Sequence, residues 1–374
     1  MSFLGRFLLS AGLSFSSWLV LYHGAAQGQT TTPKRATVQM GGAIQSTASA
    51  QGKVVTTLAS KARGALLDSP QGITTDGVYL YVADPSNNTI SRAAIATGVV
   101  TRMAGSLTTQ AWGYADGPGS VANFKRPQGI TTDGTHLYVA DTFNHVIRKI
   151  VIATGVVSTL SGRWSTSGVL GFDDGVAVDA SFNSPRGITT DGAYLYVSDT
   201  GNHTIRKITI ATGAVTTLAG TPGIVGHADG IGAAASFDSL TGITTDGTNL
   251  YVADTKNNAI RKVVIATGAV TTLAGQAGTY GSDDGVGAKA RFTGPYGVVT
   301  DGTNVFVADA FNHTIRKIAV ATGVVTTIAG VPGVSGKADG LGLNATFSRP
   351  ASLTNDGVYL YVADTQNSAI RIVE

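Results

Sequence analysis

Short apolar runs separated by polar turns recur along most of the chain, and four of them make up one unit. In the unit that begins at Gly129 the runs are "GITTD", "LYVAD", "VIRKIVI" and "VVSTLSG". An Asp-Gly pair, a "TFNH" loop and an "ATG" turn join them. β-Branched and aromatic residues favour strands, and Asp-Gly between two such runs is a strong hairpin signal. No window has a helical period, so the pattern predicts units of four antiparallel strands.

The unit occurs six times, which indicates stacked copies of one supersecondary structure. Tyr-Val-Ala-Asp or a close variant begins at Tyr81, Tyr138, Tyr196, Tyr251, Phe306 and Tyr361. Six units of four short strands predict an all-β fold, a six-bladed β-propeller of four-stranded blades over residues 53–374.

The sixth unit ends at "AIRIVE" and lacks a fourth run, whereas a spare copy, "VVTTLA", precedes the first unit at Val54–Ala59. Six complete sets of four therefore require the N-terminal strand to pair with the C-terminal blade. We expect Val54–Ala59 to lie beside Ala369–Val373, which closes the ring without a free sheet edge.

The repeated segment "PQGITTDGTHLYVADTFNHVIRKI" resembles the NHL repeat, with its Pro-x-Gly-Ile, Tyr-Val-Ala-Asp, Asn-His and Ile-Arg elements. The resemblance covers about residues 54–374. It implies a propeller, but NHL propellers include scaffolds, RNA and protein binders, and lyases. Long Gly- and Asp-rich inserts between units, such as "GTPGIVGHADGIGAAASFDS", depart from the basic pattern. They resemble inserts in secreted bacterial NHL proteins.

The first residues have a different composition. One Arg, an apolar run from Phe7 to Tyr22 and the small residues near Ala26 follow the plan of a secretory signal peptide, which we place at residues 1–28. An uncleaved membrane anchor is the alternative, but the run is short for a span. Residues 29–52 are rich in Thr, Ser, Ala and Gly, which predicts a flexible linker. We expect an exported protein, periplasmic or extracellular, with no membrane span after cleavage.

Charge and cysteine content exclude several function classes. The formal net charge is +3 and the basic residues are evenly spread, which argues against a nucleic-acid partner. The chain has no cysteine, which excludes disulfides and a cysteine nucleophile. We expect a monomer.

Most of the repeated polar residues have a structural interpretation. An Asp that ends the second strand of every unit suits a turn, and an Arg on the third strand suits pairing with an Asp of a neighbouring unit. The Asn-His histidines are replaced by Asn or Ser in other units, so none is indispensable. A Phe before the first strand of five units suits packing between blades.

The Asp-Gly pairs of the inserts suit turns, with calcium as the alternative because it binds several oxygens. Otherwise no cofactor is expected. These aspartates are Asp116, Asp174, Asp229, Asp284 and Asp339.

Function is expected where the copies differ. The connection into each first strand and the loop between the second and third strands emerge on one face of the ring, here called the loop face, and loops on a rigid scaffold commonly carry function. The residue after Pro in Pro-x-Gly-Ile varies from copy to copy, so these residues should ring the mouth of the central channel. We hypothesise one binding face, with drift under weak constraint as the alternative. Its candidate residues are Trp112, Phe143, Trp164, Arg186, Tyr296 and Phe311.

Two functional classes follow. The first is a secreted, rigid scaffold that binds protein or polysaccharide through the loop face. The second, implied by the resemblance, is a metal-dependent lyase or lactonase-like enzyme. Such enzymes place carboxylates or His near the axis, whereas the inner runs here read "GITTD" or "GVVTD" with little variation. No serine elbow, phosphate loop or zinc helix is present, so we assign no catalytic residue and favour the scaffold.

Overall fold

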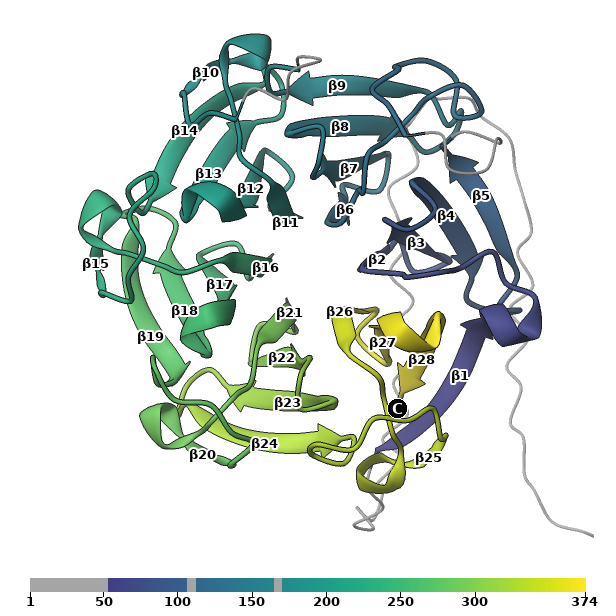
Figure 1. Cartoon of the computed structure of the whole chain (residues 1–374), viewed down its shortest axis with the longest axis vertical. Helices are drawn as coiled ribbons and strands as arrows, with labels where there is room; N and C mark the ends of the chain where they lie inside the picture. Colours follow the sequence, from purple (N-terminus) through teal and green to yellow (C-terminus); the bar gives the residue numbers. More distant parts are fainter. Residues whose placement is uncertain (1–52, 106–111, 165–169) are drawn as a thin grey trace, which may run out of the picture. The chain divides into compact units, whose positions relative to one another are not determined.

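The computed structural model describes residues 53–105, 112–164 and 170–374. They form six antiparallel sheets arranged as blades around a central axis (Figure 1). The predicted six-bladed β-propeller is confirmed. The signal peptide and linker expected within residues 1–52 lie outside the described residues. In the part of the chain that the structure describes, no helix is long and apolar enough to cross a membrane.

Each blade runs outward from the axis in chain order, with β2, β6, β11, β16, β21 and β26 innermost (Figure 1). Blade 1 consists of β2 (Gly72–Thr75), β3 (Tyr79–Asp84), β4 (Thr89–Ala94) and β5 (Val100–Ala104). Blade 2 consists of β6 (Ile130–Thr132), β7 (His136–Asp141), β8 (Val146–Val151) and β9 (Val157–Ser161). Blade 3 consists of β11 (Pro185–Thr190), β12 (Tyr194–Asp199), β13 (Thr204–Thr209) and β14 (Ala214–Ala219).

The second half of the ring repeats this order. Blade 4 consists of β16 (Leu240–Thr245), β17 (Asn249–Asp254), β18 (Ala259–Val264) and β19 (Ala269–Gly275). Blade 5 consists of β21 (Pro295–Thr300), β22 (Asn304–Asp309), β23 (Thr314–Ala319) and β24 (Val324–Ala329). Blade 6 consists of β26 (Pro350–Asn355), β27 (Leu360–Asp364), β28 (Ala369–Val373) and the N-terminal β1 (Val54–Ser60).

The ring closes as the sequence predicts. β1 pairs antiparallel with β28, from Val55 opposite Val373 to Ser60 opposite Ala369. Figure 1 shows β1 in the same blade as β26, β27 and β28 although the two segments lie at opposite ends of the propeller sequence. Strands from both ends of the chain thus share one blade.

The inserts change the expectation of four strands per blade. In four blades the insert adds a fifth, two-residue strand to the outer edge of the sheet that follows it. In blade 2 an isolated bridge between Gly117 and Val157 takes the same place. Asp-Gly at these positions was too short a signal to predict a strand. The four added strands are β10 (Gly175–Val176), β15 (Gly230–Ile231), β20 (Gly285–Val286) and β25 (Gly340–Leu341).

In the described ranges, helix is limited to single 3-10 turns. Four follow the added outer strands, three lie between the second and third strands of blades 3, 4 and 6, and one follows β1. They are η1 (Lys61–Arg63), η2 (Ala177–Asp179), η3 (Thr200–Asn202), η4 (Gly232–Ala234), η5 (Thr255–Asn257), η6 (Gly287–Lys289), η7 (Gly342–Asn344) and η8 (Thr365–Asn367).

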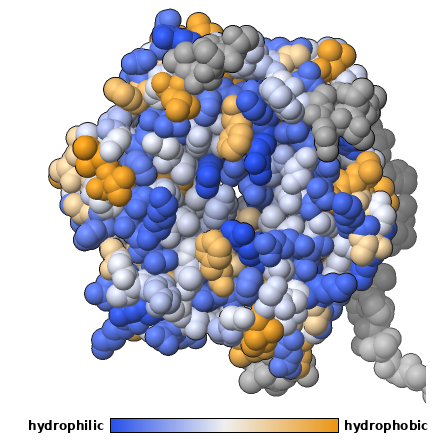
Figure 2. All heavy atoms as spheres, in the orientation of Figure 1, coloured by the Kyte–Doolittle hydropathy of each residue, from blue (hydrophilic) through white to orange (hydrophobic). Residues whose placement is uncertain are grey.

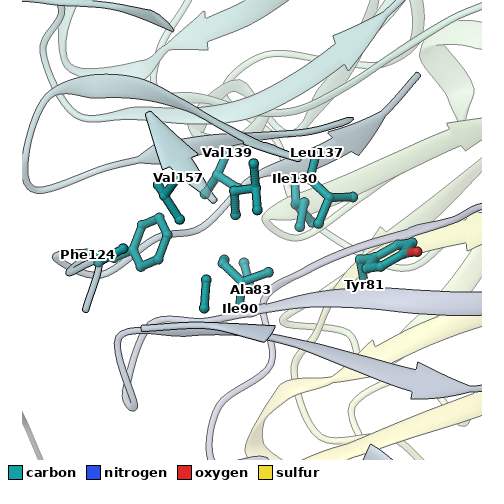
Figure 3. Close-up of a cluster of buried hydrophobic side chains, with 11 residues drawn as sticks. Tyr81, Ala83, Ile90, Phe124, Ile130, Leu137, Val139 and Val157 are labelled. Carbon is teal, nitrogen blue, oxygen red and sulfur yellow. The ribbon is translucent and has the colours of Figure 1, made fainter. Parts of the chain in front are cut away.

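The apolar core lies between adjacent blades. Figure 3 shows one such layer, in which Ala83 and Ile90 of blade 1 face Phe124, Ile130 and other side chains of blade 2. Phe124 is fully buried there. The same arrangement occurs around the ring, so the prediction that the repeated Phe packs between blades is confirmed. It recurs at Phe182, Phe237, Phe292 and Phe347.

The glycine of Pro-x-Gly-Ile allows the innermost strands to meet at the axis. A Cβ added to Gly187 would lie 2.0 Å from the carbonyl oxygen of Thr241 in the next blade. That distance is far inside van der Waals contact, so only glycine permits this approach.

Candidate functional site

The repeated Asp and Arg form one buried network in each of blades 2 to 6. In blade 3, Arg206 donates through Nη1 to Asp199 at 2.9 Å and through Nη2 to Asp174 of the insert at 2.8 Å. The Arg206 guanidinium also lies 5.1 Å from the centre of the Phe182 ring. Both aspartates belong to the same blade as the Arg or to the insert that precedes it, so the expectation of pairing with a neighbouring unit was wrong.

The Asp that ends the second strand is a structural residue. Asp199 is fully buried and accepts hydrogen bonds from the Asn183 backbone at 2.8 Å and the Asn202 side chain at 2.7 Å. Burial raises the pKa of its carboxyl, against the opposing charge of Arg206. The structural role is confirmed, but the backbone donor lies in the segment before β11 rather than in the loop that follows Asp199, which contributes the Asn202 side chain, and an ion pair is added.

The insert aspartates also have protein partners. Asp174, which is half exposed, accepts from Arg206 and from the backbone and hydroxyl of Thr217, at 3.1 and 3.0 Å. The four other insert aspartates have equivalent Arg and Thr partners. Within the described ranges, no cluster of three or more His, Asp or Glu side chains is placed to hold a metal ion. These contacts favour a structural role, and calcium binding stays a prediction.

The Asn-His position connects each blade to the next. His145 lies in the left-handed region, with φ of 59°, and its Nδ1 accepts from the backbone of Ser184 in the segment leading to blade 3, at 2.9 Å. Asn88 makes the equivalent bond in blade 1, to the Arg126 backbone at 2.8 Å. Because Asn and His both supply an acceptor in this conformation, they are interchangeable.

The surroundings of these histidines disfavour the charged form. Burial lowers the pKa of His145, His203 and His313. A protonated Nδ1 would lose its role as acceptor for the neighbouring backbone.

The variable residues of Pro-x-Gly-Ile ring a central cavity of about 110 Å³, as predicted. Arg186 of blade 3 donates to the Tyr296 hydroxyl of blade 5 at 3.3 Å, and that hydroxyl donates to Oε1 of Gln128 in blade 2 at 3.1 Å. Three blades thus contribute to one polar network across the axis. The six residues of the ring are Gln71, Gln128, Arg186, Thr241, Tyr296 and Ala351.

A second group of variable residues forms an open groove of about 400 Å³ between blades 1 and 2. Trp112 and Phe143 line it, and their side chains are 66% and 38% exposed. Lys125 lies 4.8 Å from the centre of the Trp112 ring, and the Arg126 guanidinium lies 5.1 Å from that of Phe143. We call these four residues, with the loop of Pro85 that completes the groove, the aromatic groove.

The two remaining candidates lie elsewhere. Trp164 stacks on Tyr114, with ring centres 4.4 Å apart, so it joins two successive inserts. Phe311 belongs to blade 5, opposite the blade of Phe143, and lies beneath Arg349. The six candidates therefore form an axial pair, a groove pair and two separate aromatic residues rather than one patch. Figure 2 agrees, because apolar residues are scattered over the visible face.

Sequence reasoning singled out Arg186 and Tyr296 but not their partner Gln128, nor the cations of the aromatic groove. Gln128 occupies the same variable position as the two residues it joins, so that position contained a signal. Lys125 and Arg126 directly precede Pro-x-Gly-Ile. Their place beside Trp112 and Phe143 in one groove is created by the fold, and no local pattern indicates it.

Comparisons with known proteins address the fold and the repeat. The chain is 33% identical over 280 residues to the Arabidopsis thaliana protein SUPPRESSOR OF QUENCHING 1, chloroplastic, which covers 70% of the chain and 26% of that protein. It is 29% identical over 298 residues to human NHL repeat-containing protein 2, which covers 70% of the chain and 40% of that protein. These matches coincide with six blades that each carry the repeat.

The chain is an NHL-repeat β-propeller. No family model matches it. The chain spans less than half the length of these two curated relatives.

Solved structures show the same fold at low sequence identity. A Bacteroides thetaiotaomicron protein of unknown function has a TM-score of 0.63 at 20% identity, covering 86% of this chain and 75% of its own. An auxiliary nutrient binding protein from the same species has a TM-score of 0.62 at 17% identity, covering 82% and 69%. A streptogramin B lyase has a TM-score of 0.53 at 12% identity, covering 86% and 98%. At these identities the likeness concerns the fold alone.

In this NHL-repeat propeller the conserved-looking and the variable positions have different roles. The repeated Asp, Arg, Phe and His side chains are used in blade structure. The side chains that remain available on the loop face come from positions that differ between copies.

Proposed function

We propose that this propeller is a rigid scaffold that binds a protein or polysaccharide chain through its loop face. The observation that carries the proposal is the aromatic groove. Exposed aromatic rings are common energetic centres of binding surfaces, and here Trp112 and Phe143 are held by a scaffold that closes on itself.

The charge of the groove favours an acidic ligand. Among the described residues neither the Lys125 ammonium nor the Arg126 guanidinium has an acidic partner, and no Asp or Glu lines the groove. An acidic chain would pair with both cations and cover both rings. Complementary charge of this kind raises association rates and gives a dependence on salt.

Export to the periplasm or the extracellular space is part of the proposal, supported by the apolar N-terminal run and the small residues that follow it. Cell fractionation of the natural host tests it. Recovery of the chain from the cytoplasm alone would contradict export.

The groove is tested by measuring affinity for acidic and neutral polysaccharides and for acidic peptides, with Trp112→Ala and Phe143→Ala. Truncation of a central aromatic residue should weaken binding by about 30-fold or more. Tyr280→Ala is the matched control, because Tyr280 is 79% exposed and lies in the insert before blade 5. Equal binding by the wild type and the Trp112→Ala/Phe143→Ala double variant would contradict the proposal.

A further inference from the structure

The mouth of the central channel has the features of a small-molecule site that is separate from the aromatic groove. Of the residues that line its cavity, Arg186 alone carries a charge, and none is Asp, Glu or His. Figure 2 shows a small opening near the centre of the ring on the visible face. A cation therefore faces an otherwise neutral, half-enclosed space.

Arg186 has spare hydrogen-bonding capacity. Within the described part of the chain it has no acidic partner, and its contact with the Tyr296 hydroxyl is to one Nη1 donor. Its Nε is buried without a partner, as is Oε1 of Gln71, which lines the same cavity from blade 1. One cavity thus offers an unused donor beside a positive charge and, separately, an unused acceptor.

The fold does not require these side chains. Thr241 and Ala351 occupy the same position in blades 4 and 6, and the innermost strands there have the same place in the ring. A guanidinium and a phenol at the equivalent positions of blades 3 and 5 are therefore not explained by packing of the repeat. Nε is also unpaired in the structural Arg of blades 2 to 6, so the unpaired Oε1 of Gln71 is the more distinctive atom of this cavity. Buried polar groups are normally paired, and we expect its natural partner to be another molecule.

We propose that the channel mouth binds a small hydroxycarboxylate. The carboxylate pairs with Arg186 and accepts from its Nε, and a hydroxyl group of the same ligand donates to Oε1 of Gln71. Arg suits carboxylates because its planar donors match two oxygens. The cavity of about 110 Å³ has room for roughly four water molecules, which matches a compact acid of a few carbon atoms.

The test compares three compounds of similar size by isothermal titration calorimetry on the full chain. Lactate has both groups, propionate lacks the hydroxyl, and propane-1,2-diol lacks the carboxylate. We expect lactate to bind more tightly than propionate by roughly tenfold, the value of one well-formed hydrogen bond, and the diol not to bind. No binding of lactate, or equal binding of lactate and the diol, would overturn the proposal.

Variants assign the binding to the channel mouth. Arg186→Gln should weaken lactate binding by about tenfold or more, and Gln71→Leu should remove the preference for lactate over propionate. Arg349→Gln, which changes a surface Arg of blade 6, is the matched control and should leave binding unchanged. Lactate binding that survives Arg186→Gln would refute the site.

Folding and the groove are separable from this test. Tyr296→Phe keeps the ring but removes the hydroxyl that accepts a hydrogen bond from Arg186. The Arg186 guanidinium would then be less firmly positioned, so lactate binding should weaken in a folded protein. An unchanged affinity would count against the proposed pocket. Neither Arg186 nor Tyr296 contacts the aromatic groove residues in the described structure. Binding of lactate and binding of an acidic polymer can therefore fail independently.

Discussion

Blade 1 lacks a set of side chains that the other five blades share. Ser91 stands where blades 2 to 6 have the buried Arg, and Leu67 stands where they have the buried Phe. Among the segments that lead into the first strand of a blade, the one between β1 and β2 is also the one without an Asp-Gly pair. Blade 1 still forms four strands and still ends β3 with the buried Asp84.

The joint loss of Arg, Phe and Asp-Gly shows what the network does. In blade 3 Arg206 connects the end of β12 to the insert, and its guanidinium lies over Phe182. Where no insert has to be held, all three residues are replaced. The Arg therefore anchors the insert, whereas the Asp at the end of the second strand, which all six blades keep, belongs to the blade itself.

The largest effect is expected in blade 6, where the N-terminal strand β1 completes the sheet and closes the ring. Deletion of residues 1–60 removes β1, exposes the β28 edge and opens the cluster that contains Val55. Because an uncovered edge strand promotes association, the variant should lose its folded state or aggregate. Circular dichroism and light scattering measure this, with deletion of residues 1–52 as control. A soluble, folded ring after the longer deletion would show that closure by β1 is dispensable.

The next largest effect is a difference in stability between two substitutions at the same position of blade 3 and blade 1. Arg206→Ala leaves Asp199 buried without its charge partner, which typically costs about 3–5 kcal/mol. Ser91→Ala, at the matching position of blade 1, should stay within about 1 kcal/mol of the wild type. Urea denaturation compares the two. Similar losses for both variants would mean that the Arg does not anchor an insert.

A smaller effect is expected at the exposed end of the network. Asp174→Ala removes the acceptor for Arg206 and Thr217 but keeps Asp199 in place, so it should cost about 1 kcal/mol. Thermal unfolding with EDTA and then with calcium tests the calcium hypothesis in the same experiment. A calcium-dependent rise of the wild-type midpoint that Asp174→Ala reduces would assign metal binding to the insert.

The smallest effect concerns the connections between blades, where blade 1 uses Asn88 and blades 2, 3 and 5 use His. Because burial lowers the pKa of these histidines, the unfolded chain binds protons more strongly than the folded one. The contribution of these histidines to the free energy of unfolding is therefore fully present above about pH 6.5, the ordinary His pKa. It is lost as the pH falls through that value toward the lowered pKa.

The triple variant His145→Asn/His203→Asn/His313→Asn imitates blade 1 and should flatten this dependence. Thermal midpoints of the variant and the wild type, measured from pH 8 to pH 5, provide the comparison. An equal decline in both proteins would show that other groups control the acid sensitivity.

The sequence by itself determined the number of blades, the order of their strands and the closure of the ring. These follow from local alternation, from Asp-Gly turns and from a fourth strand displaced to Val54–Ala59, all of which depend on neighbouring residues or on counting copies. It also indicated that the repeated polar residues are structural, because the repeated Asp suits a turn and the histidines are replaced in other units. The ring of variable residues at the channel mouth followed from the same count.

Only the tertiary structure decided which of the candidates meet. Arg186, Tyr296 and Gln128 come from three different blades, and Trp112 meets Lys125 across an insert whose path no local pattern specifies. It also placed Arg206 between Asp199 and Asp174 of its own blade and added an outer strand to four sheets. Such contacts depend on how rigid blades are arranged around an axis and on where long inserts turn. That arrangement is set by packing between distant segments. No single copy of the repeat specifies this packing, because it depends on all the copies together.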